Sequence, residues 1–232
     1  MSVQWNLRWL IHRNGRALNG IEYSNTYVFN KALGWKGVLV ELSPDNYKNL
    51  PVNRPNEVAT VNAAVCNTRQ QLHVVSNRGA VSAVYEFASP QFRAQWWKGI
   101  DSPDQLPTVE CMPLVDILDQ HMPANDKVIV DDGVHDDSTT TTSLSSQPVG
   151  RRYFFDFFSL DVEGGELGVL QSIDWDRTAF GIIIMEGPLE HDLSGDAKMA
   201  LLVKNGYIHL GWIRGNHWYI NQDFHEIYKD IL

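Results

Sequence analysis

Three short apolar runs that each end in a carboxylate constrain the fold of this 232-residue chain more than any other feature. The runs are residues 37–41, ending in Glu41, residues 153–161, ending in Asp161, and residues 180–186, ending in Glu186. Near-continuous apolar runs of strand length are typical of parallel sheets, whose strands are buried on both faces. Segments 24–34 and 197–204 instead carry apolar residues at helical spacing. This alternation of strands and helices predicts an α/β fold with a mainly parallel sheet.

Local signals place the ends of several elements. Ser24 is a residue type favoured at helix N-caps, and Gly34 is suited to end the same helix. Between them, Val28 and Leu33 belong to an apolar face that we expect to be buried. Near the end of the chain, two β-rich segments flank Gly215 and predict a C-terminal antiparallel hairpin.

Two segments depart from this pattern. Residues 1–16 are predicted to make a poor first strand, because charged and polar side chains such as Arg8 and Arg13 interrupt the few apolar ones. Residues 131–152 combine acidic residues with a Ser/Thr tract and no apolar periodicity, which predicts a flexible insertion. The length favours one domain over residues 1–232, with an atypical N-terminus and this insertion.

Composition argues against several classes of partner. The chain has 19 Lys and Arg against 28 Asp and Glu, a formal net charge of −9, and no basic cluster. Neither nucleic acid nor an anionic membrane surface is therefore an expected partner. The first residues lack the features of a secretory signal, and no apolar run is long enough for membrane insertion, so we expect a cytoplasmic protein. The sequence gives no indication of oligomeric state.

The cysteine content predicts free thiols. Cys66 and Cys111 are the only cysteines, which is too few for a disulfide framework, and neither has metal-type spacing to other Cys or His residues. We expect both thiols to be reduced and buried in the core, and no metal site.

The polar residues that follow the predicted strands are candidates for a ligand site, because open α/β sheets bind ligands at the carboxyl ends of their strands. Ala17-Leu18-Asn19-Gly20 precedes the Ser24 helix, and Gly20 would let backbone approach an adenosine-type ligand closely. Glu41 lies 21 residues after Gly20 and could accept both hydroxyl hydrogens of a ribose. Gly20 could equally serve the turn alone, and Glu41 could be a solvated residue at a strand end.

Further acids and a histidine are candidates for catalysis. Asp161 and Glu163 flank Val162 just before Gly164, and either could position a substrate or accept a proton from a hydroxyl nucleophile. Glu186 ends a third strand on the same expected edge, and His191 lies five residues beyond it as a possible general base. The alternatives are that Asp161 caps the next helix and that His191 is merely solvated.

Taken in order, these segments resemble the FkbM methyltransferases, a branch of the class I fold that uses S-adenosylmethionine. The matching segments are residues 17–26, 33–37 into Val40-Glu41, 53–55, 64–66, 81–82, 111–114, 158–164 with Glu166-Leu167 and Val169-Leu170, and Asn205-Gly206-Tyr207. The most specific of them is Phe158-Ser159-Leu160-Asp161-Val162-Glu163-Gly164. The resemblance implies a Rossmann-like, seven-stranded sheet, S-adenosylmethionine as methyl donor, and a hydroxyl of a sugar, polyketide or similar small metabolite as acceptor.

The resemblance also implies roles for individual residues. It places the Ala17–Gly20 turn and Glu41 at the donor, and Asp161 and Glu163 between donor and acceptor. The residues that we expect to bind the donor are Ala17, Asn19, Gly20, Asn25, Glu41 and Asp161. For catalysis, our first choice is Asp161 or Glu163, and the strand-end position of Glu186 and the nearby His191 make these two the second choices. The chain departs from the family at Asn14-Gly15-Arg16, where members usually have an acid, an apolar residue and a glycine. Because Arg16 would crowd the donor, we expect weak donor binding that Arg16→Gly strengthens.

Two other functions remain open at this point. One is a catalytically impaired binding module of methyltransferase type, which the departure at residues 14–16 would favour. The other is a nicotinamide-dependent oxidoreductase, which would also use a glycine turn and Glu41. That alternative lacks a complete Gly-x-Gly-x-x-Gly motif and leaves the Asp161–Gly164 segment unexplained.

Overall fold

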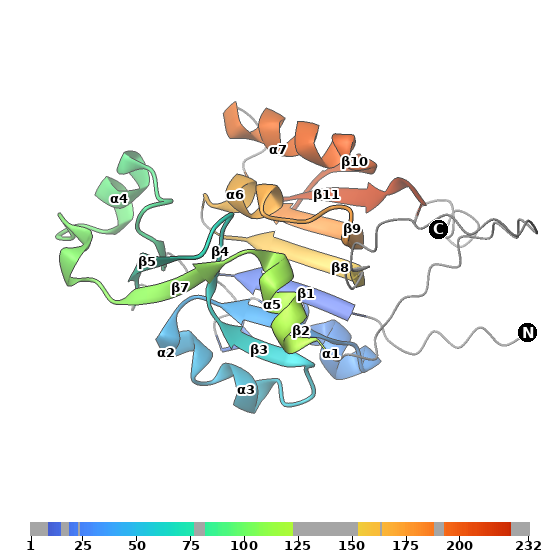
Figure 1. Ribbon diagram of the computed structural model, residues 1–232, viewed down its shortest axis with the longest axis horizontal. Helices are drawn as coiled ribbons and strands as arrows, with labels where there is room; N and C mark the ends of the chain where they lie inside the picture. Colours follow the sequence, from blue (N-terminus) through green and yellow to red (C-terminus); the bar gives the residue numbers. More distant parts are fainter. Residues whose placement is uncertain are drawn as a thin grey trace, which may run out of the picture.

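A computed structural model of the chain describes residues 9–14, 19–22, 24–76, 82–122, 153–162, 164–187 and 193–223. These residues form a mixed α/β fold around a seven-stranded sheet of order β10-β11-β9-β8-β1-β2-β3 (Figure 1). Its strands are β1 (Trp9–Asn14), β2 (Lys36–Glu41), β3 (Ala59–Asn62), β8 (Tyr153–Asp161), β9 (Thr178–Glu186), β10 (Tyr207–Ile213) and β11 (Asn216–Asn221). The first five of these strands pair in parallel, whereas β11 runs antiparallel to both β9 and β10. The predicted α/β class and terminal hairpin are confirmed.

Strand β1 corrects the expectation that residues 1–16 make a poor first strand. Trp9–Asn14 is an interior strand of the sheet, paired in parallel with β2 on one side and β8 on the other. An interior strand forms backbone hydrogen bonds along both of its edges, and this tertiary pairing outweighs the weak local preference of a polar sequence. The insertion predicted at residues 131–152 lies outside the described residues.

The core forms around the aromatic side chains of β8 and β9. Phe158 stacks on Phe180 with ring centroids 4.5 Å apart. Phe155 also stacks on Phe180, with ring centroids 5.7 Å apart. All three side chains are fully buried, as are Val38 and Val40 of β2. Helices α5 (Leu114–His121), α6 (Glu166–Gln171) and α7 (Leu193–Lys204) add the apolar side chains Ile117, Leu118, Val169, Leu170 and Leu202 to this core.

Helix α1 (Tyr27–Leu33) begins later than predicted and buries none of its residues. Its N-cap is Thr26 rather than Ser24, and Val28 and Leu33 are 59% and 61% exposed. Contact with the sheet runs mainly through Phe29, whose ring lies 5.3 Å from that of Phe157. The expected end is confirmed, because Gly34 takes a left-handed conformation with φ of 68°.

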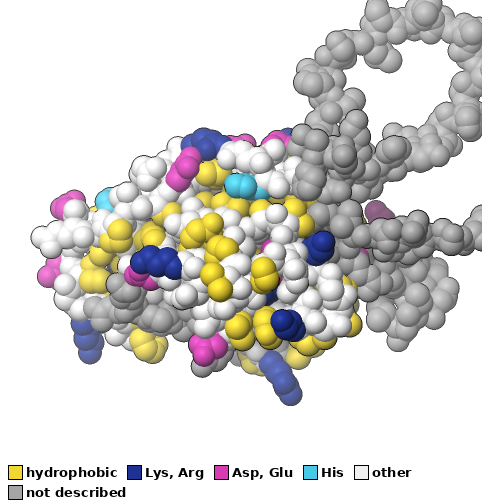
Figure 2. Space-filling view, turned by 90° about the horizontal axis from the view of Figure 1, so that it is seen from below, with side chains coloured by type: hydrophobic (Ala, Val, Ile, Leu, Met, Phe, Trp, Pro, Cys, Tyr) yellow, Lys and Arg dark blue, Asp and Glu magenta, His cyan; other side chains and the backbone are white. Residues whose placement is uncertain are grey.

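Two short helices, α2 (Pro44–Tyr47) and α3 (Leu50–Asn53), follow β2. Both lie below the main sheet in Figure 1. The space-filling view from below shows apolar side chains scattered among polar ones on this side, with few charges (Figure 2). Across the described residues, no helix combines the length and the apolar character needed to cross a membrane.

A second, smaller sheet extends from one end of the main sheet. It has the order β4-β7-β5-β6, with β4 (Ala64–Val65), β5 (Gln70–Val75), β6 (Ala83–Val84) and β7 (Thr108–Met112), and carries helix α4 (Pro90–Trp96). Because β4 begins two residues after β3 ends, this sheet lies at the carboxyl edge of the main sheet (left in Figure 1). We did not expect a separate sheet from the sequence, because its strands are short and pair across long stretches of chain.

The prediction of two free thiols is wrong. Cys66 and Cys111, which are 45 positions apart in sequence, form a disulfide with Cα atoms 5.8 Å apart. Pairing of β4 with β7 brings the two together, since Ala64 is opposite Cys111 and the Cys66 N–H donates to the Met112 carbonyl. Cysteine spacing alone could not reveal this, because the strand pairing that joins them is non-local.

Candidate active site

A row of polar residues occupies the carboxyl edge of the main sheet. Strand register places Asn14, the last residue of β1, opposite both Glu41 and Asp161. Glu41 is in turn opposite Asn62 of β3. Leu160 pairs with Met185, so the next residues, Asp161 and Glu186, are level as well. The edge at which ligands bind in open α/β sheets therefore carries the strand-end acids Glu41, Asp161 and Glu186.

Glu41 is fully buried at this edge, and its surroundings hold it in one orientation. Its Oε1 accepts a hydrogen bond from the Ser43 N–H at 2.8 Å and a longer one from Asn46 Nδ2 at 3.5 Å. Asn62 Nδ2 donates to the Glu41 carbonyl at 2.7 Å. Backbone donors of this kind stabilise a charged carboxylate away from water.

Arg54 anchors the segment that leads into helix α1. Its buried guanidinium donates to the Gly20 carbonyl at 3.0 Å, to Ser24 Oγ at 3.2 Å and to Thr26 Oγ1 at 3.1 Å. It also forms an ion pair with Glu57, whose side chain is 1% exposed. Burial raises the pKa of the Glu57 carboxyl, and the Arg54 charge opposes that rise. The position of residues 20–26 thus depends on a buried ion pair that is distant in sequence.

Gly20 is required by its conformation and by its neighbours. Its φ is +83°, and a Cβ atom there would lie 2.7 Å from Leu50 Cδ1 and 2.8 Å from Arg54 Cγ. We expect Gly20→Ala to lower the free energy of unfolding by about 2–4 kcal/mol, from left-handed strain and overpacking together. Chemical denaturation measures this loss.

Gly34→Ala is the matched control for Gly20→Ala. Gly34 also has a positive φ, +68°, but nothing lies within 4 Å of an added Cβ. The control variant should lose only the strain component, about 1–2 kcal/mol. Equal losses at the two positions would contradict a close packing role for Gly20.

The turn after Asp161 is held by a second buried ion pair. Glu166 Oε1 accepts hydrogen bonds from the Val162 N–H at 3.1 Å and the Gly164 N–H at 3.2 Å. Lys198 of α7 approaches the other oxygen of Glu166 at 3.8 Å, and both side chains are more than nine-tenths buried. Phe87, in the turn after β6, also packs against this turn, since a Cβ on Gly165 would come within 3.1 Å of its ring. These contacts fix the backbone on which Asp161 is presented.

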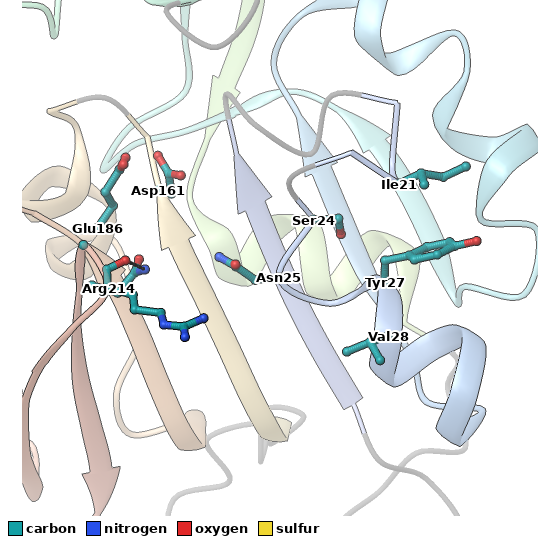
Figure 3. Close-up of a pocket in the computed structure, with 10 residues that line it drawn as sticks. Ile21, Ser24, Asn25, Tyr27, Val28, Asp161, Glu186 and Arg214 are labelled. Atoms are coloured by element: carbon teal, nitrogen blue, oxygen red, sulfur yellow. Dashed lines mark hydrogen bonds between the residues drawn. The ribbon is translucent and has the colours of Figure 1, made fainter.

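A cavity of about 450 Å³ opens beside Asp161, between helix α1 and the hairpin of β10 and β11. Its polar lining comes from Ser24, Asn25, Asp161, Glu186, Arg214 and Asn216. Figure 3 shows Asp161 and Glu186 close together at the ends of β8 and β9, with Asn25 across from them. Asn25 is held there by a hydrogen bond of 3.1 Å from its Nδ2 to the Ser159 Oγ.

The residues expected in the site are only partly brought together. Three of them, Asp161, Glu186 and Asn25, line the cavity. The side chain of Glu41 and the segment of Asn19 and Gly20 lie nearby on the same edge but do not line the cavity. Ala17, Glu163, His191, and Gly15-Arg16 of the departure lie outside the described residues.

The hairpin turn, residues Arg214, Gly215 and Asn216, also lines the cavity, although its sequence predicted only a turn. The available signal was the strand order, because a hairpin added antiparallel to the strand that ends in Glu186 brings its turn to the same edge. Among the described residues, no group of three or more His, Cys, Asp or Glu side chains is arranged to hold a metal ion.

Comparison with known proteins decides the family. A family model described as the methyltransferase FkbM domain matches residues 14–208, which is most of the chain. The chain belongs to the FkbM methyltransferase family. This confirms the resemblance inferred from the sequence, and residues from Asn14 through Glu41 to Glu186 fall within the FkbM domain.

Other comparisons add little to this assignment. The search of curated proteins gives no match. A solved structure, the human methyltransferase 10 domain containing protein, is similar with a TM-score of 0.39 and 12% sequence identity, over 95% of this chain and 73% of that one. A likeness so remote carries no information about the activity of this FkbM domain.

Proposed function

We propose that this chain is an S-adenosylmethionine-dependent O-methyltransferase with a Rossmann-like class I domain, acting on a hydroxyl of a small metabolite or sugar. The observation that carries the proposal is the level row of Glu41, Asn14 and Asp161, next to a polar cavity, within an FkbM domain. The strand order supports it. In the sheet, β2 and β3 follow β1 in one direction, whereas β8 and β9 lie in the other direction, so a topological switch point lies between β1 and β8.

The donor would lie across the ends of β2, β1 and β8. Glu41 would accept the ribose hydroxyls, and the segment of Asn19, Gly20 and Asn25, anchored by Arg54, would approach the methionine part. The fixed carboxylate of Glu41 and the turn held by Glu166 fit such a ligand, because each is already oriented by backbone hydrogen bonds. When bound, S-adenosylmethionine supplies a methyl group on a sulfonium centre.

The acceptor would occupy the cavity with its hydroxyl facing Asp161. A hydroxyl is a weak nucleophile, so a base that takes its proton accelerates the reaction by roughly 10²–10⁴-fold. Asp161 is 5% exposed and lines the cavity, which allows it to accept that proton at a carboxylate oxygen. Glu186 is adjacent and would orient the acceptor or receive the proton instead; Glu163 and His191 remain further candidates.

The direct test is methyl transfer. Purified protein is incubated with S-adenosylmethionine labelled in its methyl group and with fractionated metabolite extracts, and mass spectrometry follows the label. Label in a product hydroxyl that depends on the protein supports the proposal. Failure of the protein to bind the donor by calorimetry would instead identify the chain as a binding module without methyl transfer.

Replacement of Glu41 tests the donor site separately. We expect Glu41→Gln to weaken binding of S-adenosylhomocysteine by about 1–3 kcal/mol, because a charged acceptor for two hydroxyls is lost. Gln is preferable to Ala because its amide oxygen still accepts the Ser43 N–H. Glu110→Gln, at an exposed position of β7, is the control and should leave binding unchanged. Unaltered affinity in a folded Glu41→Gln variant would remove Glu41 from the donor site.

A further inference from the structure

Arg214 occupies a backbone position that disfavours it. It is the first residue of the two-residue turn between β10 and β11, with φ of 50°, and Gly215 follows with φ of 89°. Positive φ at both positions is the geometry in which Asn-Gly or Gly-Gly is usual. A long cationic side chain gains nothing from this backbone, so its presence is better explained by the place that the turn gives its guanidinium.

The turn places that guanidinium in the cavity beside Asp161. Asn216 is opposite Glu186 in the sheet register, so the turn lies at the same edge as the strand-end acids. In Figure 3 the Arg214 side chain extends from the turn toward Asn25. Among the described residues that line the cavity, Arg214 is the one with a cationic side chain. It forms no ion pair with a described carboxylate.

The cavity therefore has opposite charges on two parts of its lining. Asp161 and Glu186 end neighbouring strands, while Arg214 comes from the hairpin beyond β9. One strand separates β11 from β8, so the turn stands roughly 10 Å from the line of Asp161 at about 4.8 Å per strand. Glu41 is two strands farther away, on the other side of Asp161. Arg214 is thus placed on the acceptor side rather than on the side proposed for the donor's ribose.

We propose that Arg214 binds an anionic group of the methyl acceptor, a carboxylate, sulfate or phosphate, while the acceptor's hydroxyl faces Asp161. This inference rests on the proposed function and narrows its acceptor to acidic hydroxylated molecules, and a uronic acid is an example among sugars. The planar guanidinium can hold such an anion through two parallel hydrogen bonds. The carboxylates of Asp161 and Glu186 repel the anionic end and so orient the acceptor with its hydroxyl toward them.

The test compares two sugars that differ in one charge, D-glucuronate and D-glucose, titrated into the isotope-labelled protein and followed by NMR. Each titration is run with and without S-adenosylhomocysteine. We expect the wild-type protein to bind D-glucuronate about fivefold to tenfold more tightly than D-glucose, a preference that weakens with added salt. Arg214→Gln should abolish the preference, and Arg214→Lys should keep part of it. Lys204→Gln removes an exposed cation outside the cavity lining and should leave the preference intact.

Three outcomes overturn the inference. The first is no preference for D-glucuronate in the wild-type protein, whether both sugars bind equally or neither binds. The second is a preference that survives in Arg214→Gln. The third is weaker binding of S-adenosylhomocysteine to Arg214→Gln, because Arg214 would then serve the donor's carboxylate. Failure of the wild-type protein to bind S-adenosylhomocysteine would count against the proposed function, whereas donor binding without an anion preference would count against this inference alone.

Discussion

Arg54→Met should destabilise the folded protein by about 3–5 kcal/mol, because it leaves the buried Glu57 carboxylate without its counter-ion. It also removes the donors to the Gly20 carbonyl, Ser24 and Thr26. We therefore expect the segment before α1 to loosen and donor affinity to fall together with stability. Chemical denaturation and calorimetric titration of S-adenosylhomocysteine measure the two effects.

The dependence on pH distinguishes this explanation from a simple loss of packing. Burial already raises the pKa of Glu57 above 4.5, and removal of Arg54 should raise it further. A carboxyl with a raised pKa in the folded state contributes stability at low pH that is lost as the pH rises through that pKa. The deficit of Arg54→Met should therefore shrink as the pH falls toward 4.5, and Glu57→Gln in the same chain should restore part of the stability at neutral pH.

Arg69→Met is the matched control for this prediction. Arg69 also forms ion pairs, with Glu110 and Asp116, but its side chain is 47% exposed. An exposed pair of this kind contributes less than about 1 kcal/mol. Losses of similar size in Arg69→Met and Arg54→Met would contradict the special role of the buried pair.

Asp161→Asn should reduce turnover on the order of 100-fold or more while the melting temperature stays nearly unchanged. The amide keeps the shape of the side chain but cannot accept the hydroxyl proton, so the contribution of a general base is lost. Binding of S-adenosylhomocysteine should change much less than turnover, because the base acts on the acceptor.

Two further variants make the role of Asp161 specific. Glu186→Gln tests the neighbouring acid of the same cavity and should have the smaller effect if Asp161 is the base. Asp45→Asn changes an exposed acid in helix α2 and should leave turnover unaltered. An Asp161→Asn variant that unfolds would show that the carboxylate supports the turn before α6, and the base would then have to be sought elsewhere in the cavity.

Strands with strong local patterns could be predicted closely from the sequence. The run that ends in Asp161 is a strand with the expected bounds, Tyr153–Asp161, and the runs that end in Glu41 and Glu186 are strands as well. Parallel strands buried on both faces need continuous apolar side chains, and this need leaves a direct mark in the sequence. The acids at their ends marked the edge of the sheet at which the candidate site lies.

Other features were decided only by tertiary contacts. Trp9–Asn14 became an interior strand because β2 and β8 pair with its two edges, and Cys66 meets Cys111 because β4 pairs with β7. Arg54 reaches across 34 residues to hold Gly20, and the hairpin turn brings Arg214 into the cavity of Asp161. Each of these depends on pairings between segments distant in the chain. The sequence determined the three apolar strands that end in Glu41, Asp161 and Glu186, whereas the order and register of all the strands decided which side chains share one cavity.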